Sequence, residues 1–498
     1  MKIQFLFTYL FIHLIFFACQ KPKDHKRPNI IVILADDLGY GDLSCYNENP
    51  IFKTNHIDKL AAQGIRFTDA HSSSAVCTPT RYSILTGRYS WRTKLKKWVL
   101  KPWEAPLIET DRLTLPTLLK KQGYYTTAVG KWHLGWNWPG RDSLAVMKSN
   151  GENVDYSSGI TGGPLNCGFD YYFGDDVPNY PPYTFIENEK VSAVPTIQKP
   201  DSLFGHKGKM ASNWKLAQVM PAITEKAVKE IEKASQNKDN PFFLYFALTA
   251  PHTPIAPTGQ FTNKSGAGLY GDYVMQVDWT VGQILEALER NHLSENTLVI
   301  FTSDNGSPAR DGTNYSGPTG SVIEKYGHKA NGDLRGLKAD IWEGGHRVPF
   351  IVSWGKEIPN GLTNNNTICS MDLMATIADL TGYHLPENAG EDSENILPLL
   401  YGKDHPELKK RALVHHSGAG VFAIRKGDWK LILSNKSGGF SDSKYPQGFG
   451  IETAGQLYNL KEDLNEEVNL YHQFPDKVNE LSDMLKDIQE KESSVLIE

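Results

Sequence analysis

The chain contains few cysteines, which limits what can hold it together. Of its 498 residues five are cysteines, Cys19, Cys45, Cys77, Cys167 and Cys369. Four scattered cysteines downstream of Cys19 do not have the dense pattern of a small disulfide-stapled domain. The sequence leaves open one bridge among Cys45, Cys167 and Cys369. The length exceeds one compact core of ordinary size, so we expect one large domain and one small one.

The chain also lacks a strong net charge, an internal repeat and a low-complexity tract. Its formal net charge is −5, which argues against a general nucleic-acid binder. This balance does not exclude a locally basic pocket for an anionic substrate. Hydrophobic residues make up 40% and charged residues 22%, which is typical of a globular protein.

One long apolar run, residues 5–18, lies at the N-terminus after Lys2. It is too short for a membrane span and has the form of a secretory signal. Because it ends at Ala18-Cys19, it resembles a bacterial lipoprotein signal with Cys19 as the lipidated residue, although Phe16 stands where leucine is usual. The alternative is an ordinary signal peptide followed by a coincidental cysteine.

The lipoprotein interpretation predicts an exported protein of a Gram-negative bacterium, either periplasmic or an outer-membrane lipoprotein. Residues 1–18 would be the signal peptide and residues 19–27 a linker. The N-terminal lipid would then be the contact with the membrane.

Short apolar runs separated by helical patterns predict the fold class. Such runs are typical of strands buried on both faces of a parallel sheet. Helices are predicted over Asn55–Gly64, Leu113–Gly123 and Val274–Arg290, the first two ending at glycine. This alternation predicts an α/β doubly wound domain. The runs are Ile30–Ala35, Tyr124–Val129, Phe242–Leu248, Leu298–Thr302 and Pro349–Trp354.

Four of these predicted strands are followed by charged or metal-binding side chains. In open α/β sheets, ligands bind beyond the carboxyl ends of the strands. The sequence therefore predicts one active site at which four strand ends meet. The residues are Asp36 and Asp37 after the first strand, Lys131 and His133 after the second, His252 after the third, and Asp304 and Asn305 after the fourth.

Asp36, Asp37, Asp304 and Asn305 together form a set of oxygen donors. Carboxylates and an amide, without a neighbouring cysteine or histidine in sequence, favour Ca²⁺ or Mg²⁺ over Zn²⁺. Each pair alone would also suit a turn. As two pairs that each follow a buried strand, they predict a cation site.

Cys77-Thr-Pro-Thr-Arg81, followed by Leu85-Thr-Gly-Arg88, resembles the signature of the type I sulfatases, whose cysteine is oxidised to formylglycine. The segments around Asp36-Asp37, Gly130–Gly135, His252 and Asp304-Asn305 resemble other segments of that family in the same order. The resemblance covers roughly residues 28–460. A short motif alone would be weak evidence, but five in the family's order are not.

The resemblance implies an alkaline-phosphatase-like fold, in which helices on both sides cover a mostly parallel sheet. It implies a catalytic sulfatase domain over residues 28–385 and a C-terminal subdomain over residues 386–498. The sequence itself predicts short strands at Arg411–His415, Val421–Arg425, Trp429–Leu433 and Gln456–Leu460, and a helix with apolar residues from Val478 to Ile488. A small antiparallel sheet with a packed helix accounts for this pattern.

Cys77 is the expected nucleophile once it is formylglycine, and it must therefore stay unpaired. The hydrated aldehyde offers one oxygen to attack sulfur and a second to expel sulfate. If a helix starts near Pro79, Arg81 lies on the same side as Cys77, and the modified residue lies at a helix N-terminus that favours anions. The alternatives are a buried small thiol for Cys77 and a surface salt bridge for Arg81.

The resemblance also implies roles for the other site residues. Ca²⁺, favoured over Mg²⁺, would be bound by the oxygen set next to residue 77. Lys131 and Lys338 would bind sulfate, His133 would help release it, and His252 would protonate the leaving alcohol. Since Lys131 and His133 are two residues apart, an extended stretch would turn both the same way. Glu343, Gly344, Gly345 and Arg347 would have structural roles.

One family position does not map well. Many arylsulfatases have a polar residue such as serine after the segment that is Gly168–Gly174 here. Asn179 and Tyr180 follow that segment, and the sequence does not choose between them.

The expected substrate is a sulfated carbohydrate, either a glycosaminoglycan or a marine algal glycan such as ulvan or carrageenan. Aromatic and basic residues alternate in Tyr89–Trp103, which either lines the mouth of the pocket or is a solvated loop.

A formylglycine-generating maturase is the expected protein partner. Two alternatives are a phosphonate or phosphate monoester hydrolase and a non-catalytic sulfoglycan-binding protein. The oligomeric state does not follow from the sequence.

Overall fold

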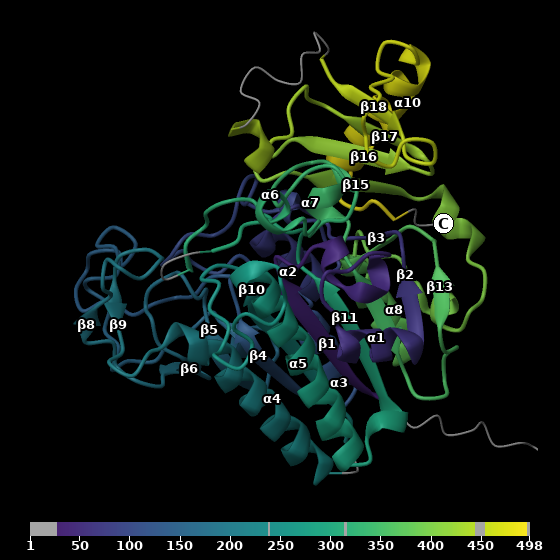
Figure 1. The fold of residues 1–498 in the computed structure, drawn as a ribbon. Helices are drawn as coiled ribbons and strands as arrows, with labels where there is room; N and C mark the ends of the chain where they lie inside the picture. Colours follow the sequence, from purple (N-terminus) through teal and green to yellow (C-terminus); the bar gives the residue numbers. More distant parts are fainter. Residues whose placement is uncertain (1–26, 238–239, 313–315, 444–453, 496–498) are drawn as a thin grey trace, which may run out of the picture.

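The computed structural model describes residues 27–237, 240–312, 316–443 and 454–495. A ten-stranded sheet lies at its centre (Figure 1). From one edge to the other its strands are β13 (Leu362–Asn364), β2 (Gly64–Phe67), β12 (Phe350–Ser353), β11 (Thr297–Ser303), β1 (Asn29–Asp36), β10 (Phe242–Pro251), β4 (Tyr125–Lys131), β5 (Tyr171–Asp175), β6 (Ile186–Glu187) and β7 (Lys190–Val191).

The middle of the sheet is parallel, as the sequence predicts. Strands β11, β1, β10, β4 and β5 run in one direction, so their carboxyl ends lie along one edge. Strand β12 was expected among the parallel strands, but it pairs antiparallel with β11 and with β2. The chain therefore re-enters from the end at which β11 leaves it.

Helices cover both faces of the sheet, because side chains alternate between the faces along each strand. In β1, Ile31 and Ile33 contact one helical layer and Ile30 and Val32 the other. The first layer contains α1 (Asn55–Ala62), α4 (Val219–Ser235) and α5 (Gly268–Arg290). The second contains α2 (Cys77–Thr86), α3 (Leu115–Lys121), α8 (Leu373–Leu380) and α9 (Leu397–Leu400).

The helix predictions need correction at three points. No prediction covers α4, and α5 begins at Gly268 rather than Val274, because Gly268 and Gly271 weaken the local helical signal. Helix α1 ends at Ala62, so Gly64 is not its stop. Gly64 opens β2, where a Cβ atom would lie 2.0 Å from the Val352 carbonyl oxygen.

The predicted C-terminal sheet is confirmed. It is antiparallel, with β15 (Ala412–His416), β16 (Phe422–Lys426), β17 (Trp429–Ile432) and β18 (Gln456–Asn459) in that order. Helix α10 (Pro475–Glu490) packs on it through Val478, Leu481, Leu485 and Ile488. In Figure 1 this yellow-green part lies next to α7 (Glu343–His346).

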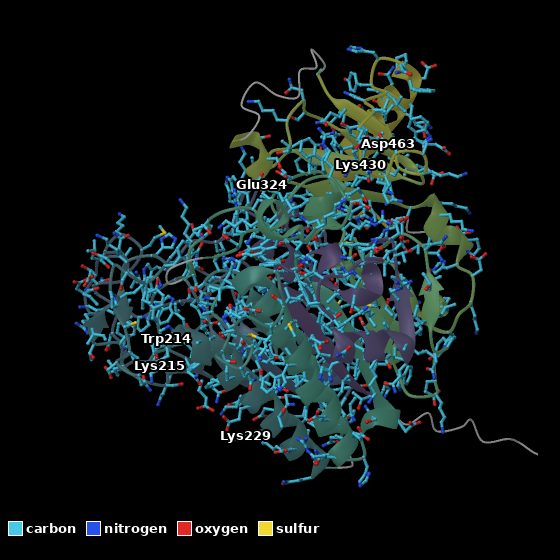
Figure 2. The ribbon with its side chains drawn as sticks, in the orientation of Figure 1. Trp214, Lys215, Lys229, Glu324, Lys430 and Asp463 are labelled. Atoms are coloured by element: carbon cyan, nitrogen blue, oxygen red, sulfur yellow. The ribbon has the colours of Figure 1, made fainter. Side chains whose placement is uncertain are left out.

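A lobe between β4 and α4 extends from the edge of the sheet that carries β5 to β7 (Figure 1). It holds the strand pair β8 (Ile197–Gln198) and β9 (Lys209–Met210) and a small core that includes Tyr183 and Trp214. Figure 2 labels Trp214 in this lobe and Lys430 in the C-terminal sheet. The remaining short elements are β3 (Ala70–His71), β14 (Ile368–Cys369) and α6 (Val322–Tyr326).

Two further predictions concern a disulfide bridge and the N-terminal apolar run. The cysteines in the described part of the chain, from Cys45 to Cys369, are all free, so the bridge that the sequence left open is not formed there. Cys19 and the apolar run at residues 5–18 lie outside the described residues. No helix in the described ranges combines the length and the apolar character needed to cross a membrane.

Candidate active site

Cys77 is the first residue of α2, at the carboxyl edge of the sheet. The helix begins two residues before the position predicted for it, so Pro79 is its third residue. All ten residues of α2 are buried, and Cys77 is 1% exposed. A helix start presents unbonded N–H groups, which favour an anion beside residue 77. Burial raises the pKa of the Cys77 thiol to about 12, although Lys131 and Lys338 oppose this shift.

Arg81 lies one turn into α2 and is fully buried, which excludes a surface salt bridge. Its Nε and Nη2 atoms donate to Asp304 Oδ2 at 3.0 and 2.7 Å. Its Nη1 atom donates to the Lys131 carbonyl at 3.0 Å. Arg81 therefore joins α2 to the ends of β4 and β11.

Two buried lysines neutralise the aspartates at the end of β1. Lys131, the last residue of β4, donates from Nζ to both Asp36 oxygens, at 2.8 and 3.0 Å. Lys338 approaches Asp37 from the loop before α7, with Nζ 2.6 Å from Oδ1 and 2.8 Å from Oδ2. Burial opposes the ionisation of Asp36, but Lys131 prevails and holds the pKa of that carboxyl well below its usual range.

The four predicted oxygen donors lie together at the ends of β1 and β11. The Asp37 backbone N–H donates to Asp304 Oδ1 at 3.2 Å, and Asn305 Nδ2 donates to Asp37 Oδ1 at 2.7 Å. Ligand atoms of Asp36, Asp37, Cys77 and His252 lie within 4.8 Å of one another. Burial and the Asp36 carboxylate raise the pKa of Asp304 to about 6.

These residues fit a hard divalent cation. The donors are carboxylate and amide oxygens, which Ca²⁺ and Mg²⁺ prefer. Asn305 Oδ1 is buried and has no hydrogen-bond partner among the described residues, so a cation would satisfy it. Without the ion, the negative charges of the three aspartates equal the positive charges of the arginine and the two lysines. A divalent ion would leave the site positive, which suits an anionic substrate.

His252 follows β10 and faces the same group. Its Nε2 atom is 3.8 Å from Asp37 Oδ2, and its Nδ1 atom contacts the Thr253 carbonyl oxygen. Burial lowers the pKa of His252 to about 4, against the opposing charge of Asp36. The ring is therefore neutral near pH 7 in the free protein, with Nε2 as the nitrogen turned to the site.

His133 lies beside this group rather than in contact with it. The chain turns at His133, whose φ is 56°, so it does not continue the extended strand of Lys131 as predicted. Its Nε2 atom contacts the Leu100 carbonyl at 3.0 Å, and its Nδ1 atom is buried without a hydrogen-bond partner among the described residues. A left-handed residue two positions beyond the end of a strand is hard to recognise in sequence.

His133 has two neighbours, Asp176, which was not predicted, and Tyr180, which the sequence left undecided. Asp176 accepts the His133 backbone N–H and the Trp136 indole N–H through Oδ1, both at 3.2 Å. Tyr180 packs its ring edge-on against His133, with ring centroids 5.6 Å apart. Asp176 directly follows β5, so the rule that strand ends carry the site could have found it.

Glu343 and the histidines His346 and His415 are buried outside the predicted site. Glu343 accepts from Lys430 Nζ at 3.0 Å and from Arg347 Nη1 at 3.3 Å, in keeping with a structural role. The buried histidines His346 and His415 stack at 4.0 Å with 9° between the ring planes. Because the two rings lie in nearly parallel planes, their in-plane nitrogen lone pairs do not meet at one ion.

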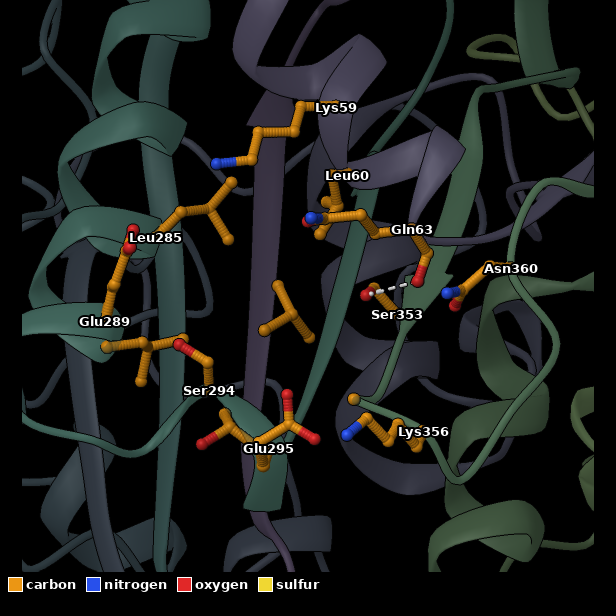
Figure 3. A pocket seen from close by; sticks show the side chains of 14 residues that line it. Lys59, Leu60, Gln63, Leu285, Glu289, Ser294, Glu295, Ser353, Lys356 and Asn360 are labelled. Carbon is orange, nitrogen blue, oxygen red and sulfur yellow. Dashed lines mark hydrogen bonds between the residues drawn. The ribbon is translucent and has the colours of Figure 1, made fainter.

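A surface pocket of about 400 Å³ lies at the opposite end of the sheet (Figure 3). Its lining includes Thr297, the first residue of β11, whereas the predicted site follows the last residue of that strand. Lys59, Glu289, Glu295 and Lys356 supply its charges. It shares no residue with the predicted site.

The sequence matches the sulfatase family model over residues 28–383. It is 34% identical to an N-acetylgalactosamine-6-O-sulfatase of Bacteroides thetaiotaomicron, with 94% of each chain covered. It is 30% identical to human steryl-sulfatase, covering 85% of this chain and 77% of that one.

Two solved structures share the fold over nearly the whole chain. One is a Bacteroides thetaiotaomicron protein described with the metabolism of multiple glycosaminoglycans, with a TM-score of 0.80 and 32% identity over 93% of this chain and all of that one. The other is Ps i-CgsB in complex with k-i-k-neocarrahexaose, with a TM-score of 0.69 and 26% identity over 95% of each chain. The chain belongs to the sulfatase family and is a hydrolase that acts on sulfate esters.

Proposed function

We propose that the protein removes sulfate groups from fragments of sulfated polysaccharides, either glycosaminoglycans or marine algal glycans such as carrageenan or ulvan. One observation carries the proposal. Residue 77 lies at a helix N-terminus and is surrounded by buried Arg81, Lys131 and Lys338. Named relatives that act on N-acetylgalactosamine-6-sulfate or bind a carrageenan oligosaccharide support the substrate class.

Cys77 acts in this proposal after a maturase has oxidised it to formylglycine. An unmodified thiol with a pKa raised to about 12 is protonated at neutral pH and is a weak nucleophile. The hydrated aldehyde supplies an oxygen nucleophile and a second hydroxyl through which sulfate is released. Arg81 would hold the aspartates of the site in position, with its Nη2 atom 3.6 Å from Asp36 Oδ1.

Asp36, Asp37, Asp304 and Asn305 would bind Ca²⁺, favoured over Mg²⁺, next to residue 77. The ion would neutralise charge on the transferring sulfate group. Lys131 and Lys338 fix positive charge on two sides of the same place, and fixed charges need no reorganisation during the reaction. Each lysine is already held by an aspartate, so its position does not depend on the substrate.

His252 Nε2 would protonate the leaving alcohol. An anionic ester beside the imidazole favours its charged form, which raises a pKa that burial alone holds near 4. His133 would assist the release of sulfate from its place beside Lys131. Export as a periplasmic or outer-membrane lipoprotein, with Cys19 lipidated, would bring the enzyme to polysaccharide fragments outside the cytoplasm.

Mass spectrometry of the Cys77 peptide tests the proposal, with the protein co-expressed with a formylglycine-generating enzyme. We expect the peptide to be lighter by the difference between a thiol-bearing and an aldehyde-bearing side chain. The modified protein should hydrolyse 4-nitrophenyl sulfate faster than a 4-nitrophenyl phosphonate ester. An unmodified thiol beside a modified control sulfatase, or a preference for the phosphonate, would count against it.

A further inference from the structure

Trp98 has an exposed side chain and an unfavourable backbone conformation. Its φ is 57° and 44% of the residue is exposed. A residue with a Cβ atom enters the left-handed region at a cost in conformational energy, and large aromatic rings are usually buried. Neither feature helps to form a core, so both need another explanation.

The ring of Trp98 is nevertheless held in a defined place by the C-terminal part of the chain. The Trp98 backbone N–H donates to the Gly418 carbonyl at 2.6 Å. A Cβ atom on Gly418 would lie 2.6 Å from Trp98 Cζ3, so the absence of a side chain there makes room for the ring. The ring stacks on Phe440 with centroids 6.4 Å apart and planes 25° apart, and Phe440 is itself 40% exposed.

Backbone contacts connect this aromatic pair to two sides of the site. Two residues beyond Trp98, the Leu100 N–H contacts Thr78 Oγ1 at 3.3 Å, and the Leu100 carbonyl contacts His133 Nε2. On the other side, the Gly418 N–H donates to the carbonyl of Ala339, which follows Lys338. The pair therefore lies at the rim between the His133 side and the Lys338 side of the site.

Two exposed lysines lie close to Trp98 in the sequence. Lys97 and Lys101 are exposed, and neither forms an ion pair with any residue that the structure describes. Lys97 also lies against Gly420, close to the Gly418 that supports the ring. Aromatic faces beside free cations suit a ligand that is flat and apolar on one side and anionic at its edge.

We propose that Trp98 and Phe440 form a platform for a second pyranose ring of a sulfated oligosaccharide, with Lys97 and Lys101 facing its anionic groups. This inference rests on the proposed function and extends it to a substrate of at least two sugars. Aromatic faces pack against the apolar C–H face of a pyranose, and lysine binds sulfate or carboxylate as a point charge. Two distant parts of the chain form the platform, so it depends on the C-terminal sheet.

The test compares a small substrate with a long one in Trp98→Ala and Phe440→Ala. The probes are 4-nitrophenyl sulfate and sulfated tetrasaccharides prepared from chondroitin 6-sulfate and from carrageenan. We expect kcat/KM on the cleaved tetrasaccharide to fall about tenfold, mainly through KM. Activity on 4-nitrophenyl sulfate should stay within about twofold. Trp98→Phe should retain most of the tetrasaccharide activity.

Phe474→Ala is the matched control. Phe474 is 43% exposed and pairs with Trp429, at the opposite end of β17 from the segment that leads to Phe440. It should change neither activity. Equal losses on both substrates in Trp98→Ala, or no loss on the tetrasaccharide, would overturn the proposal.

Binding separates this inference from the proposed function. Tetrasaccharide affinity is measured by calorimetry in the inactive Cys77→Ser protein, with and without Trp98→Ala. If no substrate is cleaved but Trp98→Ala weakens binding about tenfold, the platform stands and the proposed function fails. If 4-nitrophenyl sulfate is cleaved while no tetrasaccharide is bound or cleaved, the platform is wrong and the sulfatase activity stands.

Discussion

At the scale of single residues, the site is a set of buried opposite charges in direct contact. Asp36 with Lys131 and Asp37 with Lys338 are both pairs at 2.8 Å or less. Buried pairs cost desolvation, and removing one partner leaves an uncompensated charge worth about 3–5 kcal/mol. Variants at these positions would therefore lose stability as well as activity. His252, with a neutral ring and a partly open face, is a cleaner position for a test.

His252→Ala should slow the hydrolysis of esters with poor leaving groups more than that of esters with good ones. A proton donor contributes about 10²–10⁴-fold, and the benefit grows as the leaving alcohol becomes more basic. The measurement is kcat/KM for aryl sulfates whose phenols differ in pKa. His292→Ala, an exposed histidine after α5, should leave the series unchanged. A uniform loss across the series would assign His252 to binding.

Asp36, Asp304 and His252 were predictable because each lies at or directly after the end of a buried strand. Asp36, Asp304 and His252 meet because β1, β11 and β10 are neighbours that run in parallel. Asp176 follows β5 and could have been found by the same rule, whereas Tyr180 was harder to find because it lies further into a loop that packs on His133. Trp98 could be suspected from its basic and aromatic neighbours, but its partner Phe440 could not, because the two are far apart in sequence.

At the scale of elements, glycines set the position of the cation site. Gly306 follows Asn305 and donates from its N–H to the Gly345 carbonyl, at the start of α7. A Cβ atom on Gly306 would lie 1.9 Å from the Gly344 carbonyl oxygen. Backbone is thus packed directly against backbone, next to an oxygen donor of the site.

Gly306→Ala should lower stability and weaken cation binding together. The added methyl group forces the two backbones apart, at a cost of about 1–3 kcal/mol. The wild type should gain Tm on addition of CaCl₂ and lose it with EDTA, because a ligand of the folded state stabilises that state. The variant should need more CaCl₂ for the same gain. Gly259→Ala is the control, since a Cβ atom there would meet nothing within 4 Å.

The element predictions that failed did so for local reasons. The sequence pattern gives a strand at β12 but not its direction, which depends on the path of the chain from Ser303 to Phe350. The proline rule placed the start of α2 near Pro79, but proline is tolerated throughout the first turn, and the helix starts at Cys77. The pattern therefore predicted the central strands and several helices, but not α4. Where the elements start and which way they run depended on tertiary contacts.

At the scale of the whole molecule, a buried lysine joins the C-terminal sheet to the rest of the chain. Lys430 of β17 has a fully buried side chain, with Nζ 3.0 Å from Glu343 Oε1 and 2.9 Å from Glu466 Oε1 (Figure 2 labels Lys430). Glu343 belongs to α7, which also supports Gly306. Burial raises the pKa of Glu466 to about 7, with Lys430 opposing the shift and Glu343 adding to it.

This raised pKa predicts that Glu466→Gln stabilises the protein at high pH. The folded chain holds the Glu466 proton more tightly than the unfolded chain, so this group's contribution to stability falls as pH rises from about 5 to about 8. Glutamine removes that loss, so the variant's Tm minus the wild-type Tm should increase over this range. Glu467→Gln, an exposed neighbour, should show no such trend. A difference that stays constant with pH would contradict the assignment.

The complete burial of α2 has a consequence for how active molecules arise. Every residue from Cys77 to Thr86 is buried, so a second enzyme cannot enclose this peptide in the folded chain. If Cys77 is oxidised as proposed, that oxidation has to precede folding. Under the proposed function, each molecule would become active or inactive once, during its biosynthesis. Two equally pure and equally stable preparations would then differ in specific activity according to how they were produced.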